Sequence, residues 1–128
     1  MGVLSMSICL VVDDSRVVRK VARRIIEELG FTCDESEDGQ QAYNYCSEKM
    51  PEVILLDWNM PIMSGIEFLE KLRAMPNGNQ PQVIFCTTEN DMAHIQRAMV
   101  AGANEYIMKP FDTEIIKSKF IQIGLIEE

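Results

Sequence analysis

Basic residues and long apolar runs are both scarce in this sequence. Its 128 residues include 12 Lys and Arg against 20 Asp and Glu, which leaves a formal net charge of −8. Nucleic acids bind to basic surfaces that neutralise their phosphates, so we expect no nucleic acid among the partners. No apolar run approaches the ~20 residues that span a bilayer, so we expect no membrane partner either.

Targeting signals and paired cysteines are absent as well. The amino terminus, Met1 to Ser5, lacks the basic region and the cleavage site of a signal peptide, and Met6 breaks the myristoylation pattern. The four cysteines form no CxxC pair and no metal-finger spacing. Reduced thiols are typical of cytosolic proteins, so we expect a cytoplasmic protein.

What the sequence does contain is an ordinary globular composition and one strongly apolar segment. Hydrophobic residues make up 47% of the chain and charged residues 25%, as in soluble domains. Val53 to Leu56 are consecutive apolar residues that run directly into Asp57, and Pro61 ends the segment. Such a run predicts a strand that is covered on both faces. A carboxylate at its end is costly unless another group pairs with it.

Strand and helix patterns alternate five times along the chain. Right-handed crossovers between such strands give a parallel sheet with helices on both faces. Acids rather than a GxGxxG motif follow the first strand, which favours the α/β flavodoxin-like (βα)5 three-layer sandwich with strand order 2-1-3-4-5. The expected strands are 8–12, 31–36, 52–57, 82–86 and 104–108; the expected helices are 17–29, 38–49, one from residue 64 to the loop 75–81, 91–101 and 112–123.

Three of the expected helices begin with a capping sequence. Ser15 or Asp14 can cap the first helix. Asp38 is followed three residues later by Gln41, and Ser64-x-x-Glu has the pattern of a capping box. These positions predict where the helices start.

Five polar groups follow the ends of four predicted strands. Parallel strands bring their carboxyl ends to one edge of the sheet, which would gather three carboxylates, a hydroxyl and an ammonium group there. With one histidine in the chain, His94 in a predicted helix, zinc or copper is not expected at this edge. Carboxylate oxygens favour Mg²⁺ instead. The five residues are Asp13, Asp14, Asp57, Thr87 and Lys109.

This set of groups suits phosphoryl transfer. Asp57 could attack phosphorus, while Thr87 and Lys109 could hold the phosphoryl oxygens by hydrogen bond and charge. Each acid could instead serve only a local turn or helix cap. The coincidence of five groups at four strand ends favours the shared site.

The ordered motifs resemble the receiver domains of two-component response regulators, of the CheY type. CheY is itself a known example of the strand order given above. The resemblance covers about residues 8–123, and it implies that residues 1–128 are a single receiver domain without an output domain. The matching segments are Val12-Asp13-Asp14-Ser15, Leu56-Asp57-Trp58-Asn59-Met60-Pro61, Ser64-Gly65, Thr87-Thr88, and Tyr106 with Lys109-Pro110-Phe111.

The resemblance implies a role for each matching residue. Asp57 would be the phosphoacceptor, and Lys109, after a cis bond to Pro110, would bind the phosphoryl group. Thr87 would move toward the phosphoryl group while Tyr106 turns inward. The Mg²⁺ ligands would be Asp14 directly, Asp13 through water, Asp57, and the backbone carbonyl of Asn59.

Two further residues bear on this resemblance. Asn59 and Glu89 flank the acceptor as in chemotaxis-type regulators. Thr88 stands where many relatives have alanine, and its bulk is expected to restrict the path of Tyr106.

The expected function is that of a phosphorylated signalling protein. A histidine kinase or phosphotransfer protein would phosphorylate Asp57, and a downstream protein would dock on the fourth helix, fifth strand and fifth helix. The only reactions catalysed would be its own phosphotransfer and autodephosphorylation. Chemotaxis or motility control is the expected setting, and a phosphorelay or cell-cycle shuttle is the alternative.

Two other classes of function compete with this one. A haloacid-dehalogenase-like, Mg-dependent phosphatase also uses an aspartate nucleophile, but with a second aspartate two residues later as general acid. Here that position is Asn59, and the acidic pair precedes Asp57. A binding module that is never phosphorylated is the third possibility, and no sequence feature favours it.

Overall fold

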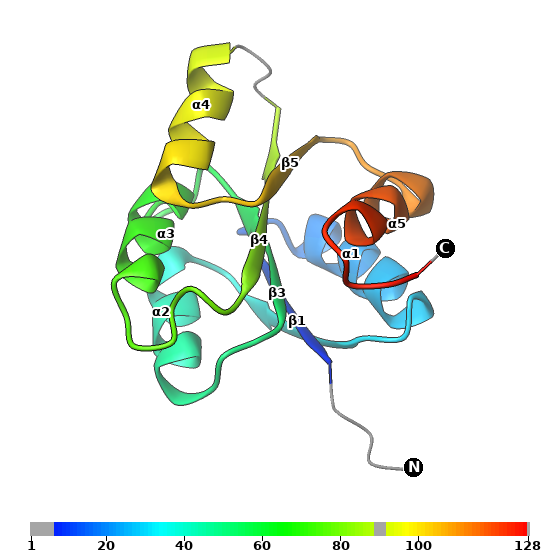
Figure 1. Ribbon diagram of the computed structural model, residues 1–128, viewed down its shortest axis with the longest axis horizontal. Helices are drawn as coiled ribbons and strands as arrows, with labels where there is room; N and C mark the ends of the chain where they lie inside the picture. Colours follow the sequence, from blue (N-terminus) through cyan, green and yellow to red (C-terminus); the bar gives the residue numbers. More distant parts are fainter. Residues whose placement is uncertain (1–6, 89–91, 128) are drawn as a thin grey trace.

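Five strands alternate with five helices in the computed structural model, which describes residues 7–88 and 92–127 (Figure 1). The strands are β1 Ile8–Val12, β2 Thr32–Ser36, β3 Val53–Asp57, β4 Gln82–Thr87 and β5 Glu105–Met108. The helices are α1 Arg16–Glu28, α2 Gly39–Glu48, α3 Gly65–Arg73, α4 Met92–Ala101 and α5 Thr113–Gln122.

All neighbouring strands are parallel, in the order β2-β1-β3-β4-β5. The flavodoxin-like fold predicted from the sequence is therefore confirmed. Leu56 of β3 lies between Val12 of β1 and Phe85 of β4 in the register. This alignment brings the carboxyl ends of the three strands, and the polar residues that follow them, to one edge.

The sheet is the middle layer of the molecule. α2, α3 and α4 cover one face and α1 and α5 cover the other (Figure 1). Each face has its own apolar cluster, because successive strand residues point to opposite sides. The central strand β3 contributes to both, and its residues Val53 to Leu56 are at most 2% exposed. None of the described helices has the length and apolar character needed to cross a bilayer.

The three predicted cap residues begin helices α1, α2 and α3, and only the capping box expected at α2 is incomplete. Ser15 accepts from the Val18 amide, and Ser64 forms a complete capping box with Glu67. Asp38 accepts from the Gln41 amide, as predicted.

The side chain of Gln41 differs from the prediction. A capping box would bring its Oε1 back to the amide of Asp38, but it accepts from the amide of Glu37 instead.

Many predicted boundaries differ from the structure by one residue, and one lies outside the described residues. β2 begins at Thr32 rather than Phe31, since the Phe31 amide donates to the Ile26 carbonyl of α1 at 3.2 Å. The Phe31 ring packs edge-on against Phe120 with the centroids 5.2 Å apart. The predicted helix start at Asp91 lies outside the described residues, in which α4 begins at Met92.

One arginine joins α3 to the turn after α4. The guanidinium of Arg73 donates to the carbonyls of Gly102, Gly78 and Pro81 and to Oδ1 of Asn104, at 2.8 to 3.1 Å. Asn104 Oδ1 also accepts from the Val83 amide. Arg73 therefore holds α3, the loop before β4 and the α4–β5 turn together.

We predict that Arg73→Ala lowers the free energy of unfolding by about 2–3 kcal/mol, because several carbonyls lose a charged hydrogen-bond donor. Lys71→Ala, at an exposed position on the same helix, should change it by less than about 0.5 kcal/mol. Urea unfolding measures both variants. Equal effects would show that Arg73 has no special role in joining these segments.

Candidate functional site

The acceptor candidate Asp57 is the last residue of β3 and is 7% exposed. The loop that follows it folds back closely, and the Gly65 amide donates to the Trp58 carbonyl at 2.9 Å. A Cβ on Gly65 would lie 2.2 Å from the Asp57 carbonyl oxygen, so only glycine fits at this position. The start of α3 thus holds the Asp57 backbone in place.

Asp13 is buried beside it, and both oxygens of its carboxylate have donors. Oδ1 accepts from the Ser15 amide at 2.8 Å, and Oδ2 accepts from Nζ of Lys109 at 2.7 Å. The Asp13 carbonyl also accepts from Arg19 at 2.8 Å. Asp14, by contrast, is exposed. The two neighbouring acids therefore have different surroundings.

Lys109 follows β5 and bridges two carboxylates. Its Nζ lies 2.9 Å from Oδ1 of Asp57 as well as 2.7 Å from Asp13. The peptide bond to Pro110 is cis, as the resemblance implied. The fold therefore brings together residues that are 52 and 96 positions apart in the sequence.

Burial and neighbouring charges shift the pKa values of Asp57 and Lys109. Burial raises the pKa of the Asp57 carboxyl above its ordinary value, the hydrogen bond from Lys109 opposes this, and the charge of Asp13 adds to it. Burial alone would lower the pKa of Lys109, but its hydrogen bonds to the two aspartates raise it. An ionised Asp57 is thus costly even with Lys109 beside it.

The three aspartates form a group with the chemistry of a metal site. Oxygen atoms from Asp13, Asp14 and Asp57 all lie within 4.8 Å of one another. Three clustered carboxylates suit a hard cation with oxygen ligands, and Mg²⁺ usually takes one or two of them and keeps several waters. The residues present therefore fit a divalent cation. Asn59 is exposed in the loop after Asp57, and a role for its carbonyl stays a prediction.

Thr87 and Tyr106 lie on neighbouring strands. Thr87 ends β4 and is 5% exposed, while Tyr106 on β5 is half-buried and is paired with Phe85 in the register. The pleat points residues 85 and 87 to the same face, toward α3 and α4, where Tyr106 also packs. The movements expected of these two residues stay predictions.

Thr88 lies on the other side from Tyr106. It is exposed and lines a hollow of about 280 Å³ with Val17 and Phe111, on the side of α1. The expectation that its bulk restricts Tyr106 is therefore not supported by this placement.

Two features of the site were missed from the sequence. His94, for which no role was predicted from the sequence, is half-buried and stacks on Trp58 with the ring centroids 3.5 Å apart. Arg19 supports Asp13 through its carbonyl and also pairs with Glu35 at 2.9 Å. Helical spacing showed that Arg19 is a polar position but not what it contacts. Glu89, which the resemblance placed beside the acceptor, lies outside the described residues.

We predict that Asp57→Asn is more stable than the unchanged protein at pH 7. The raised pKa of Asp57 means that the folded state binds the proton more tightly than the unfolded chain, so ionisation costs stability. The advantage should shrink as the pH falls through the raised pKa of the folded state, and it should vanish only below the ordinary aspartate pKa of about 3.9, where the carboxyl is neutral in both states.

Thermal unfolding between pH 4 and pH 8 measures this difference. Glu70→Gln removes the same charge at an exposed position on α3 and serves as the control for net charge. If Asp57→Asn gained nothing over this control, the burial cost of the carboxylate would be disproved.

Comparison with known proteins identifies the family. Residues 9–121 match the response regulator receiver domain. The chain is 37% identical over 112 residues to a chemotaxis protein CheY homolog of Campylobacter jejuni, covering 86% of each chain. It is 36% identical to chemotaxis protein CheY1 of Helicobacter pylori, covering 86% of this chain and 90% of the other.

The fold of this chain also matches the solved structure of a chemotaxis protein. Chemotaxis protein CheY4 of Vibrio cholerae is 27% identical and superposes with a TM-score of 0.88, covering 93% of this chain and 99% of that chain. The chain therefore belongs to the response regulator receiver domain family.

Proposed function

We propose that this protein accepts a phosphoryl group on Asp57 from a histidine kinase or phosphotransfer protein and then signals by docking to another protein. One observation carries the assignment. The buried carboxylate of Asp57 lies 2.9 Å from Nζ of Lys109, within a group of three aspartates at the carboxyl edge of the sheet. This arrangement supports the proposed roles of Asp57 as nucleophile, Lys109 as phosphate-binding cation and the acidic pair as metal ligands.

In the proposed reaction, an oxygen of Asp57 attacks the phosphorus of the donor. A phosphorus–oxygen bond forms at Asp57 as the bond between phosphorus and the donor's nitrogen or oxygen breaks, and the donor group leaves. Oδ1 already accepts from Lys109, so the other carboxylate oxygen is the one open to attack. Lys109 then stabilises the oxygens of the transferred group, with Thr87 as a further hydrogen-bond donor.

The metal would be Mg²⁺, which neutralises the charge of the phosphoryl oxygens when it is bound. Asp14 would bind it directly and Asp13 through water, with Asp57 and the carbonyl of Asn59 as further ligands. The surroundings of the two acids support direct binding by Asp14 and binding through water by Asp13. Both carboxylate oxygens of Asp13 already accept hydrogen bonds, from Ser15 and Lys109, whereas Asp14 is exposed.

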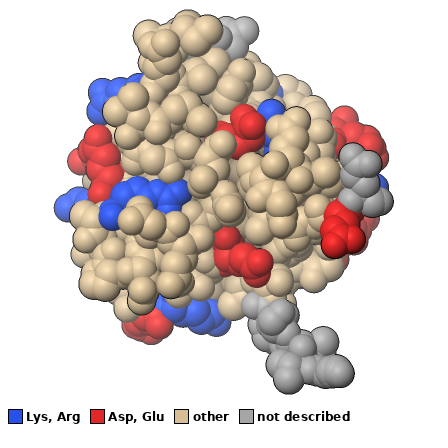
Figure 2. Space-filling model, viewed as in Figure 1, with Lys and Arg blue, Asp and Glu red and all other residues tan. Residues whose placement is uncertain are grey.

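The proposed output surface is formed by α4, β5 and α5. Helix α4 buries only Ala98. Its apolar residues Met92, Met99 and Val100 are 67%, 42% and 88% exposed. Figure 2 shows mainly uncharged side chains at the top of the molecule, where α4 lies, with a basic patch at its left side. An exposed apolar surface of this kind suits a protein partner. Tyr106 on β5 would link it to Thr87, as a switch between two populations of states.

Chemotaxis is the proposed setting, because the relatives named above are chemotaxis proteins. The phosphorelay or cell-cycle shuttle is not favoured by these relatives. The phosphatase alternative is not favoured either, since Asn59 stands where a general acid would be needed. We propose that the protein acts only on its own acyl phosphate, as a single domain that relies on docking.

We predict that incubation with Mg²⁺ and acetyl phosphate adds one phosphoryl group to the protein. Asp57→Asn should gain none, because the amide is not a nucleophile for this reaction. Lys109→Ala should be modified at least about tenfold more slowly, because it lacks the cation that stabilises the transferred oxygens. Intact-mass spectrometry over time measures all three.

The matched control is Lys117→Ala, which removes an exposed ammonium group of α5. It should be modified at the rate of the unchanged protein. A phosphoryl gain that persists in Asp57→Asn would show that the acceptor is a different residue, and no gain under any Mg²⁺ concentration would contradict the proposed function.

We predict that Mg²⁺ raises the melting temperature of the protein, because a cation bound only by the folded state stabilises it by about 2.7 kcal/mol at 100 times its dissociation constant. Asp14→Asn should lose most of this shift, whereas Glu114→Gln, an exposed carboxylate on α5, should keep it. The fluorescence of Trp58, next to Asp57, provides a second measurement. Equal Mg²⁺ shifts in both variants would rule out Asp14 as a ligand.

A further inference from the structure

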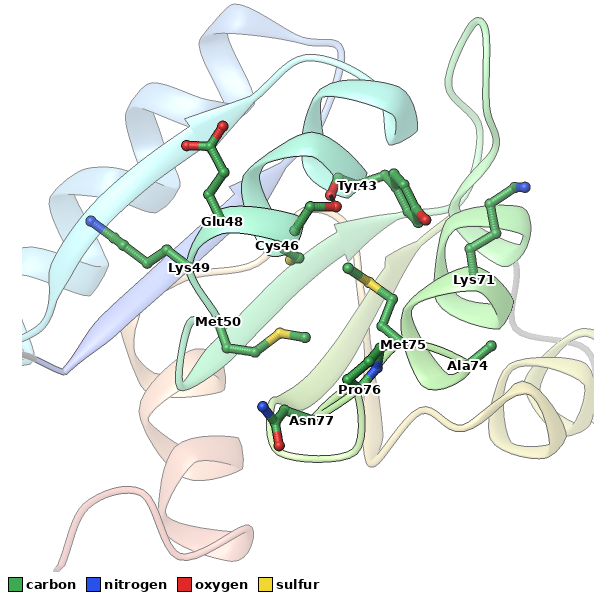
Figure 3. A pocket seen from close by; sticks show the side chains of 11 residues that line it. Tyr43, Cys46, Glu48, Lys49, Met50, Lys71, Ala74, Met75, Pro76 and Asn77 are labelled. Carbon is green, nitrogen blue, oxygen red and sulfur yellow. Dashed lines mark hydrogen bonds between the residues drawn. The ribbon is translucent and has the colours of Figure 1, made fainter.

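A second concave site lies at the opposite edge of the sheet from Asp57. It is a hollow of about 650 Å³ between the carboxyl ends of α2 and α3, which lead into the amino ends of β3 and β4. Figure 3 shows it from close by. A volume of this size is unusual for well-packed side chains and falls in the range of binding sites.

Three sulfur-containing side chains line this hollow. Met50 enters it from the segment after α2 and Met75 from the segment after α3, while Cys46 lies on α2 at its floor (Figure 3). The charged residues Lys49, Lys71 and Glu48 line the rim and extend away from the sulfur atoms (Figure 3). The interior is therefore a sulfur-rich surface without a carboxylate.

The thiol of Cys46 lies at the floor of this hollow and has no hydrogen-bond partner among the described residues. The residue is 4% exposed. The other cysteines (Cys9, Cys33 and Cys86) are packed in the apolar cluster on the opposite face of the sheet, where no described methionine joins them. Cys46 is thus the one thiol of the described chain that shares a cavity with thioethers.

We propose that Cys46, Met50 and Met75 form a binding site for a soft monovalent metal ion, Cu(I). Thiolate and thioether ligands select Cu(I), whereas Mg²⁺ prefers oxygen ligands and structural zinc sites need several thiolates or imidazoles. The floor of the hollow offers one thiol and two thioethers, and the Glu48 carboxylate at the rim extends away from them, which matches this preference. The site is separate from the acidic cluster, which would take the hard cation.

Binding would exchange the thiol proton for the metal. The S–H bond of Cys46 breaks, a sulfur–copper bond forms, the proton passes to solvent, and copper stays in the +1 state. The thiolate neutralises the ion, so no net charge is placed in the apolar floor. Burial raises the pKa of Cys46 to about 12, which means that the metal-free protein carries the proton that is released.

Competition with bicinchoninate for Cu(I), under argon with ascorbate as reductant, tests the proposal. The unchanged protein should remove one Cu(I) per chain from the coloured complex. Cys46→Ser should weaken binding by about 100-fold, and Met50→Leu and Met75→Leu by about tenfold each, in line with the loss of one ligand. The leucine variants conserve volume, and circular dichroism confirms that each variant is folded.

Cys33→Ser is the matched control, because it removes a buried thiol from the other face of the sheet. It should bind Cu(I) as tightly as the unchanged protein. The proposal is overturned if the unchanged protein fails to compete or if Cys33→Ser loses as much affinity as Cys46→Ser. It is also overturned if the two leucine variants bind normally, which would mean that the thiol binds alone.

Discussion

The ion pairs of Lys109 with Asp13 and Asp57 are the interaction on which the site depends. Three carboxylates at one edge of an apolar sheet would repel one another, and burial adds to the cost of ionising Asp57. The ammonium group offsets part of this cost and joins the end of β5 to the ends of β1 and β3. The remaining cost is what a metal ion or a transferred phosphoryl group can relieve.

The same sheet separates two kinds of binding chemistry. Its carboxyl edge collects oxygen ligands and a cation, because the polar residues follow the strand ends. Its amino edge is bordered by helix ends, and there the hollow between α2 and α3 gathers sulfur atoms. A hard and a soft metal ion would therefore bind at opposite ends of one small domain without competing for ligands.

Much of the fold and of the acidic site could be predicted because both depend on local patterns. Apolar runs that end in acids predicted the strands and placed Asp13 and Asp57 at one edge, and Ser64 with Glu67 predicted the start of α3. Contacts between distant elements could not be predicted. Phe31 packs against Phe120, His94 stacks on Trp58, and Thr88 lines a hollow on the side of α1.

The sequence by itself determined the alternation of strands and helices and the order of residues at the strand ends, because periodicity and capping act over a few neighbouring residues. Only the tertiary structure decided which of these groups touch. The distances from Lys109 to Asp13 and Asp57, the exposure of Asp14 and the presence of Met50 and Met75 in one hollow all depend on how separate elements pack. Packing brings together residues far apart in the chain, and no local pattern records which ones will meet.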